Sequence, residues 1–236
     1  FAAKARLFTD ILMHAGVAVI NIDDPYGRKL AEMIAADTAT PRVLVTLGFA
    51  KDADFRIIKI EPVAGLLQML VSHCDDDWHI PLALSGTFQA MNALTAAIMG
   101  HMSGLPLQDS LYAIAFLKAA TGRMQTVSGH PYGAQIVVDY AHTPDALAAA
   151  LAALRPEVTG RLVVLFGCGG DRDPGKRPMM GEIANAGADV IFVTDDNPRS
   201  EDASTIRSAI ITTCPNAVEI AGRDRAIATA ISELAN

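Results

Sequence analysis

The chain has 236 residues, of which 51% are hydrophobic and 19% charged, the balance of a soluble globular protein long enough for two domains. A formal net charge of -7 without any run of Lys or Arg argues against a nucleic-acid-binding protein. No apolar stretch reaches the ~20 residues of a membrane-spanning helix, and the three cysteines form no CxxC pair, so we expect a cytoplasmic, reduced protein without a zinc site.

The first part of the chain is predicted to combine helices with a sheet. A helical stretch runs to about Ala15, and short polar connections between the later strands are typical of an antiparallel meander. The predicted elements are a strand at Val17–Ile22, a helix near Arg28–Ala36, strands at Arg42–Gly48, Phe55–Val63, Leu67–His73 and Trp78–Leu84, and helices at Gln89–Met102 and Leu107–Thr121.

After Gly122 the pattern changes to a regular alternation of apolar strands and helices. Thr143 as N-cap and Pro144 at the first helical position introduce one of these helices. This alternation predicts an α/β domain with a mostly parallel, doubly wound sheet and helices on both faces. The predicted strands are Ile136–Val138, Leu162–Phe166, Val190–Thr194 and Val218–Ile220, and the helices are Asp145–Leu154, Met179–Ala186, Ala203–Thr213 and Arg223–Leu234.

We place the domain boundary at about residue 122, which divides the chain into residues 1–122 and 123–236. The chain begins with Phe1 inside a helical pattern, without a signal peptide, so we expect part of a longer protein to be absent.

Three loops that follow predicted strands carry the polar residues typical of a ligand site. They are residues 139–144, the glycine-rich residues 167–177 and residues 195–199. In doubly wound sheets, ligands bind beyond the carboxyl ends of the strands. Gly, Asp and Arg together at that edge indicate an anionic or zwitterionic ligand.

The second loop matches the glycine and lysine positions of a phosphate-binding P-loop, Gly170-x-x-x-x-Gly175-Lys176. The next residue is Arg177, where the motif needs a hydroxyl for magnesium, and Pro174 removes a backbone donor. A glycine-rich turn that lets strand and helix pack closely is the favoured interpretation.

Local structure explains parts of the other two loops. Residues 143–145 cap a helix without any ligand, but capping does not explain Asp139, Tyr140 and His142. An Asx-type turn accounts for the third loop except for Arg199. The residue patterns alone support no more than an α/β domain with a polar ligand edge.

The three loops, in this order and at this spacing, resemble the second half of the Mur ligases. The motifs are Asp-Tyr-Ala-His-Thr-Pro at 139–144, Gly-Cys-Gly-Gly-Asp-Arg-Asp-x-Gly-Lys-Arg-Pro at 167–178 and Asp-Asp-Asn-Pro-Arg at 195–199. Gly122-Arg123-Met124 and Asn21-x-Asp23-Asp24 agree with the same family, and the resemblance covers essentially the whole chain. It implies part of the family's central domain, followed by its Rossmann-like C-terminal domain.

The resemblance also implies a function. It is the ATP- and Mg²⁺-dependent joining of meso-diaminopimelate to UDP-N-acetylmuramoyl-L-alanyl-D-glutamate through an acyl phosphate, in peptidoglycan precursor synthesis. We expect a monomer with no nucleic-acid or membrane partner.

Five residues match the family's catalytic and ATP-binding positions. Lys4 is similar to a lysine that captures carbon dioxide, and the carbamate would help to hold magnesium. Asn92 matches a residue that meets adenine, although Gln89 stands where relatives commonly have Asn. Arg123 is similar to an arginine that reaches ATP phosphate, Asp139 to an acceptor of ribose hydroxyls, and His142 shapes the same pocket. Without the resemblance, Lys4 is simply a solvated helix lysine.

Four residues match positions that bind the incoming amino acid: Arg172, Asp196, Asn197 and Arg199. A guanidinium holds a carboxylate through two parallel charge-assisted hydrogen bonds. Diaminopimelate carries a carboxylate that lysine lacks, so Arg199 would accept the first and reject the second. Lysine-adding relatives usually lack this arginine.

The chain departs from the family pattern at both ends. The family's P-loop, its N-terminal domain and a C-terminal Gly-x-Gly-His-Glu segment are not found in the sequence. We therefore predict that the 236-residue chain folds but has no ligase activity alone. The alternatives are a lysine-adding or folylpolyglutamate synthase-like ligase, a non-catalytic nucleotide- or amino-acid-binding module, and a nucleotide hydrolase that uses residues 170–177.

Overall fold

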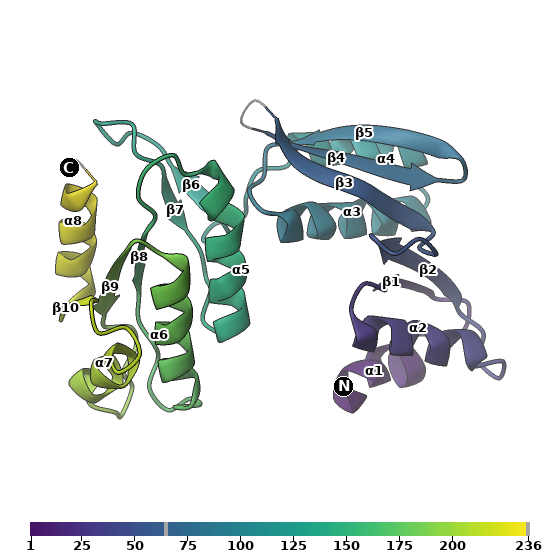
Figure 1. The fold of residues 1–236 in the computed structure, drawn as a ribbon. Coiled ribbons are helices and arrows are strands. Elements are labelled where there is room, and N and C mark those ends of the chain that lie inside the picture. The colour runs from purple at the N-terminus through teal and green to yellow at the C-terminus, as the bar shows by residue number, and fades with distance from the viewer. Residues whose placement is uncertain (64–65, 235–236) are drawn as a thin grey trace. The chain divides into compact units, whose positions relative to one another are not determined.

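A computed structural model describes residues 1–63 and 66–234 and divides the chain into two compact units, Phe1–Lys118 and Ala119–Asn236 (Figure 1). The division lies four residues before the boundary predicted from the sequence, at 118 rather than 122. The functional assignment of each unit stays a prediction. No described helix combines the length and the apolar character needed to cross a bilayer.

Unit 1 is built around a five-stranded sheet. Asp24 begins α2 by accepting hydrogen bonds from the backbone N–H groups of Tyr26 and Gly27, with Pro25 at the first helical position. The elements are α1 (Ala2–Arg6), the π-helical turn η1 (Leu7–Ile11), β1 (Val17–Asn21), α2 (Pro25–Ala36), β2 (Val43–Gly48), β3 (Phe55–Val63), β4 (Leu66–His73), β5 (Asp76–Leu82), α3 (Thr87–Met102), α4 (Leu107–Ala113) and the 3-10 turn η2 (Ile114–Phe116).

The sheet order is β1-β2-β3-β4-β5, and the predicted meander holds only for β3, β4 and β5. The prediction was wrong for β2 and β3, which are parallel and pair only at Leu47–Phe55 and Gly48–Arg56. Because the last residues of β2 pair with the first residues of β3, the connection does not have to run back along the whole strand. The six residues 49–54 are therefore long enough to join the two parallel strands. Asp54 fixes this connection, since its Oδ2 accepts from the backbone N–H of Thr46 at 2.7 Å.

Two hydrophobic cores stabilise unit 1. One lies between the β2–β5 part of the sheet and the helices α3 and α4, and it includes Phe55, Ile80 and Leu94. The other lies between β1 and α2 and also takes in Ala5 of α1. The predicted helices to Ala15 and to Thr121 are both too long, because regular helical structure ends at Ile11 and at Phe116.

Unit 2 is an α/β unit. Its helix α5 begins as predicted, with the Thr143 Oγ1 accepting from the Ala146 N–H and Pro144 at the first position. The elements are β6 (Gln125–Val127), β7 (Ile136–Val138), α5 (Pro144–Leu154), the 3-10 turn η3 (Arg155–Glu157), β8 (Val163–Phe166), α6 (Lys176–Gly187), β9 (Val190–Thr194), α7 (Ala203–Ile211), β10 (Val218–Ile220) and α8 (Arg223–Glu233).

The three parallel strands of unit 2 have the order β10-β9-β8, with helices on both faces. One core joins α5, α6 and α7 to β8 and β9, and a second joins α8 to the opposite face (Figure 1). The sequence missed β6, which pairs antiparallel with β7, so β7 does not continue the parallel ladder as predicted. A three-residue strand of few apolar positions has too weak a pattern to be detected.

Candidate functional site at the carboxyl edge of unit 2

The second and third loops of the sequence motif lie side by side, because they follow neighbouring parallel strands. Residues 167–175 leave the end of β8 and residues 195–202 leave the end of β9. The Gly170 N–H donates to the Asn197 carbonyl at 2.9 Å. The structure therefore brings together the two loops that carry the predicted amino-acid-binding residues.

Glycine is required where these loops touch. A Cβ added at Gly167 would overlap the Thr194 carbonyl oxygen, and one at Gly170 would overlap the Pro198 carbonyl oxygen. Close backbone approach, rather than phosphate binding, explains the glycine-rich sequence of the second loop.

All four predicted amino-acid-binding residues are exposed at this edge, three on the third loop and Arg172 on the second. Asp196 accepts from the Asn197 N–H at 2.8 Å, and the Asn197 side chain accepts from the Arg199 N–H at 3.3 Å. Arg199 has a left-handed backbone conformation, with φ of 52°, and its Nη1 donates to the Gly170 carbonyl. The rest of its guanidinium keeps donors for a ligand.

The first loop gathers three of the predicted ATP-binding residues. The two oxygens of Asp139 accept from the backbone N–H groups of Met124 and Ala141, both at 2.8 Å. An ionised carboxylate has about four acceptor positions, so two stay available for ribose hydroxyls. The Arg123 guanidinium lies 4.8 Å from the centre of the Tyr140 ring, and His142 Nδ1 is 3.0 Å from the Tyr140 carbonyl oxygen.

A lysine links the first and second loops. Lys176 Nζ donates to the His142 carbonyl at 2.8 Å, so the apparent P-loop lysine is engaged within the protein. Arg177, the residue after it, is buried in an ion pair with Glu201. These contacts argue against the nucleotide hydrolase that a P-loop at residues 170–177 would imply.

Beneath the third loop, a cluster of charged residues fixes the end of β9. Asp195 accepts from the Gly222 N–H at 2.7 Å and from Arg207, which also pairs with Glu219. The hydrogen bond from Gly222 and the pairing with Arg207 lower the pKa of Asp195. The sequence did not predict the contacts that Lys176, Glu201 and Arg207 make at the site, because their partners lie 34, 24 and 12 residues away.

The two candidates in unit 1 are exposed on different helices, Lys4 on α1 and Asn92 on α3. Their helices belong to separate cores, since Ala5 packs with α2 and Ala93 packs with the sheet of β2–β5. Within unit 1 the structure thus does not join them into one cluster.

The residues of the described chain offer no ready metal site. Within residues 1–63 and 66–234, no three His, Cys, Asp or Glu side chains form a group able to hold a metal ion. The Lys4 ammonium donates hydrogen bonds and repels cations. The donor set of the described residues does not fit Mg²⁺ unless Lys4 is modified.

One cavity of unit 2 has Asp139 in its lining but neither Arg172 nor Arg199. It measures about 310 Å³ and lies between β7, β8 and α8, where its walls are mostly apolar: Ile136, Val138, Leu162, Val163, Ile227 and Ile231. The three free cysteines give no nucleophile there, and burial raises the pKa of the Cys168 and Cys214 thiols.

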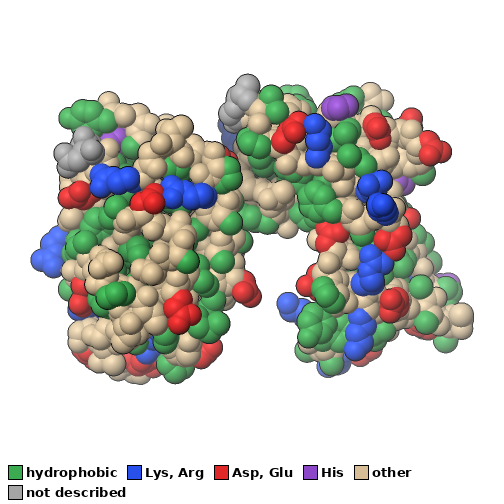
Figure 2. All heavy atoms as spheres, viewed as in Figure 1, with side chains coloured by type: hydrophobic (Ala, Val, Ile, Leu, Met, Phe, Trp, Pro, Cys, Tyr) green, Lys and Arg blue, Asp and Glu red, His purple; other side chains and the backbone are tan. Residues whose placement is uncertain are grey.

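On the face shown in Figure 2, acidic and basic side chains are interspersed over both units. No single-sign patch of the kind that steers nucleic acid is present on that face.

Two family models match the chain. The Mur ligase middle domain matches residues 1–100, and the model described as Mur ligase, glutamate ligase domain matches residues 122–236. Together they cover most of both units.

Individual proteins are similar over almost the whole chain. UDP-N-acetylmuramoyl-L-alanyl-D-glutamate--2,6-diaminopimelate ligase of Chelativorans sp. (strain BNC1) is 45% identical over 98% of this chain and 47% of its own length. A solved structure of a ligase of that name is 34% identical, with a TM-score of 0.60 over 96% of this chain and 46% of that one.

A more distant solved structure shows the same fold. Mycobacterium tuberculosis folylpolyglutamate synthase, complexed with ADP and AMPPCP, has a TM-score of 0.75 at 21% identity over 99% of this chain and 52% of that one. The chain thus spans about half the length of the curated relatives it matches.

Proposed function

The chain belongs to the Mur ligase family, and from this we propose that it is the ATP- and amino-acid-binding part of a ligase. The proposed reaction joins meso-diaminopimelate to UDP-N-acetylmuramoyl-L-alanyl-D-glutamate. The observation that carries the proposal is the carboxyl edge of unit 2, where the Arg199 loop and the Arg172 loop are hydrogen-bonded together.

The proposed chemistry has two steps. An oxygen of the D-glutamyl γ-carboxylate attacks the γ-phosphorus of ATP, which forms an acyl phosphate and releases ADP. The amine of diaminopimelate then attacks the acyl carbon, loses a proton and expels inorganic phosphate. Such reactions depend mainly on positioning and charge neutralisation.

The residues of unit 2 supply the positioning in this proposal. The free acceptor positions of Asp139 hold ribose hydroxyls, and Arg123 reaches a phosphate of ATP. The exposed guanidinium of Arg199 pairs with the far carboxylate of diaminopimelate, while Arg172 and the Asp196–Asn197 turn hold the remaining polar groups. Lysine would place an ammonium against Arg199, which disfavours it.

A ligation assay tests the proposal. Because the chain covers 47% of its relative's length, the assay uses the longer protein that contains it, with meso-diaminopimelate and L-lysine compared side by side. We expect product with diaminopimelate and far less with lysine, and a large loss of activity in Arg199→Ala. Equal use of both amino acids contradicts the substrate assignment, and no ligation with either contradicts the ligase assignment. The 236-residue chain alone is expected to give no turnover.

Lys4 extends the proposal to Mg²⁺. Carbamylation would replace its ammonium with a carboxylate-like anion, which supplies an oxygen ligand that the unmodified side chain lacks. Carbon-13 NMR in labelled bicarbonate tests this, with Lys4→Arg as the matched control. A carbamate signal that is present in both proteins, or in neither, contradicts the assignment.

A further inference from the structure

The ion pair between Arg177 and Glu201 joins the two loops of the candidate site. Arg177 Nη2 lies 2.8 Å from both oxygens of Glu201. The Arg177 side chain is only 5% exposed and that of Glu201 is 32% exposed. Arg177 belongs to α6, directly after the second loop, and Glu201 belongs to the third loop.

The location of Arg177 is electrostatically unfavourable for its own helix. It is the second residue of α6, where the helix dipole is positive and disfavours a cation. Burial adds a desolvation cost that only a well-placed anion offsets. The local structure of α6 therefore does not explain a buried arginine, whereas a connection to the third loop does.

Glu201 also holds the backbone of the second loop. Its Oε1 accepts from the Asp171 N–H at 2.6 Å. In return, the Asp171 carboxylate accepts from the Ser200 hydroxyl at 2.6 Å. The loops are thus connected in both directions, and this network explains how Asp171 keeps a left-handed φ of 51°.

The residues next to this network are the two arginines of the site. Arg172 follows Asp171, and Arg199 precedes Ser200. Arg199 itself has a left-handed backbone, and its side chain reaches back to the Gly170 carbonyl. Any change in the spacing of the loops would move both guanidinium groups relative to each other.

We propose that Arg177 and Glu201 are positioning residues that fix the spacing between Arg172 and Arg199, and hence the length of the dicarboxylic amino acid that the site accepts. This rests on the proposed function. The pair touches no substrate; it acts through the backbone of the two loops. A loosened pair would weaken binding of meso-diaminopimelate more than binding of lysine, because lysine lacks the carboxylate that Arg199 holds.

The experiment compares Glu201→Gln with Asp189→Asn in the 236-residue chain. Asp189 is a suitable control because it also pairs with an arginine, Arg155, but stands immediately before β9, at the amino end of the strands. Calorimetry measures binding of meso-diaminopimelate and L-lysine, and hydrogen exchange measures protection of the Asp171 and Gly170 amides. Thermal unfolding confirms that each variant is folded.

We expect Glu201→Gln to weaken diaminopimelate binding by roughly 3- to 30-fold and to speed exchange at Asp171, while Asp189→Asn leaves both unchanged. Ser200→Ala, an exposed substitution that leaves no buried charge unpaired, is expected to change both measurements in the same direction by a smaller factor. If Glu201→Gln does not fold, Ser200→Ala carries the test.

Unchanged diaminopimelate affinity and unchanged Asp171 exchange in Glu201→Gln, or in Ser200→Ala where only that variant folds, would overturn the proposal. A parallel loss in both amino acids would also contradict it, since the pair would then support binding without selecting length. Failure of the unaltered chain to bind diaminopimelate contradicts the proposed function instead, and the exchange measurement still decides whether the ion pair fixes the loops.

Discussion

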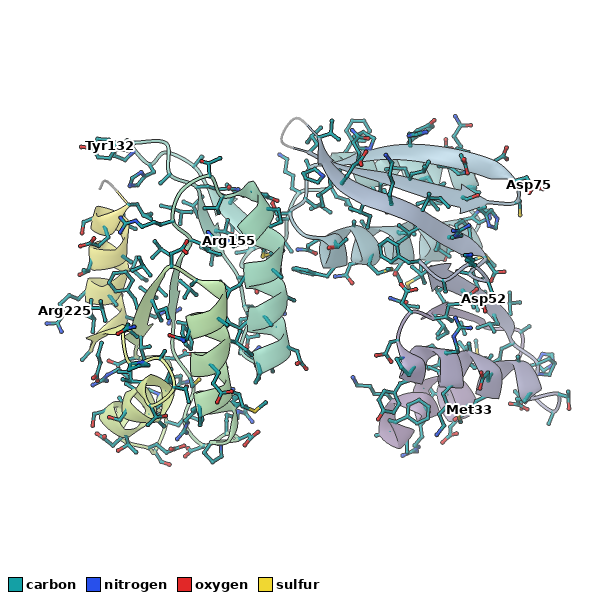
Figure 3. The ribbon with its side chains drawn as sticks, viewed as in Figure 1. Met33, Asp52, Asp75, Tyr132, Arg155 and Arg225 are labelled. Atoms are coloured by element: carbon teal, nitrogen blue, oxygen red, sulfur yellow. The ribbon has the colours of Figure 1, made fainter. Side chains whose placement is uncertain are left out.

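The two ends of the β8–β9–β10 sheet use the same kind of ion pair for different purposes. At the amino end, Arg155 (labelled in Figure 3) donates to Asp189, which also accepts from the Leu162 N–H at 2.7 Å. At the carboxyl end, Arg177 and Glu201 connect two long loops, each with a non-glycine residue in a left-handed conformation. The pair at the amino end joins Arg155 and Leu162 to the residue before β9, whereas the pair at the carboxyl end lies beside left-handed backbone and exposed arginines, which is typical of a ligand site.

The largest expected difference between the ends concerns ligand binding. Arg199→Ala removes charge-assisted hydrogen bonds worth about 1.5–3 kcal/mol, so diaminopimelate affinity should fall by roughly 10- to 150-fold. Arg155→Ala removes an arginine of the other end and should leave the affinity unchanged. Calorimetric titration of both variants measures this, and equal losses would erase the functional distinction between the two ends.

Alanine substitutions of two glycines, one at each end of the sheet, should differ in their effect on the free energy of unfolding. Gly170→Ala places a methyl group on the Pro198 carbonyl oxygen and should destabilise the chain by about 1–3 kcal/mol. A Cβ at Gly160, in the loop that precedes β8, meets no atom within 4 Å, so Gly160→Ala should change stability by less than about 0.5 kcal/mol. Urea unfolding of the two variants provides the measurement. A destabilised Gly160→Ala together with a neutral Gly170→Ala would mean that the close loop packing is not present in solution.

The smallest expected effect is on pH dependence. The hydrogen bond from Arg177 lowers the pKa of Glu201 below its ordinary value of 4.5. Since its folded-state pKa is depressed, Glu201 contributes stability that is present above about pH 4.5 and is lost as the pH falls through the folded value.

Asp189 behaves in the same way from its ordinary value of 3.8, because Arg155 lowers its pKa. Urea unfolding between pH 3 and 6 should therefore show that the stability of Glu201→Gln depends less on pH than the stability of the unaltered chain. As the pH falls, this difference should begin near pH 4.5, whereas the corresponding difference for Asp189→Asn should begin near pH 3.8. A stability profile that is steeper in Glu201→Gln than in the unaltered chain would show that the pKa of Glu201 is not lowered in the folded state.

Local sequence patterns predicted the helices and strands that hold the site, but they did not predict contacts between residues far apart in the sequence. The apolar run of β8 and the Thr143–Pro144 cap of α5 depend on neighbouring residues, so they could be predicted from the sequence. The parallel pairing of β2 with β3 depends on a two-pair overlap that no periodicity reveals.

The same limit applies to the candidate site. The loop motifs and the family resemblance predicted amino-acid-binding roles for Arg172 and Arg199, and these roles stay predictions. The residues that hold the two loops together are not adjacent in the sequence. Glu201 lies 24 residues from Arg177, and His142 lies 34 residues from Lys176. Lys4 and Asn92 were predicted from family resemblance alone, and their roles stay predictions.

The most direct test of the proposed amino-acid site is backbone-amide NMR of the 236-residue chain during titration with meso-diaminopimelate. We predict saturable shifts in residues 167–177 and 195–201, and much weaker shifts with L-lysine. Shifts confined to the lining of the cavity between β7, β8 and α8, or equal shifts with both amino acids, would contradict the account.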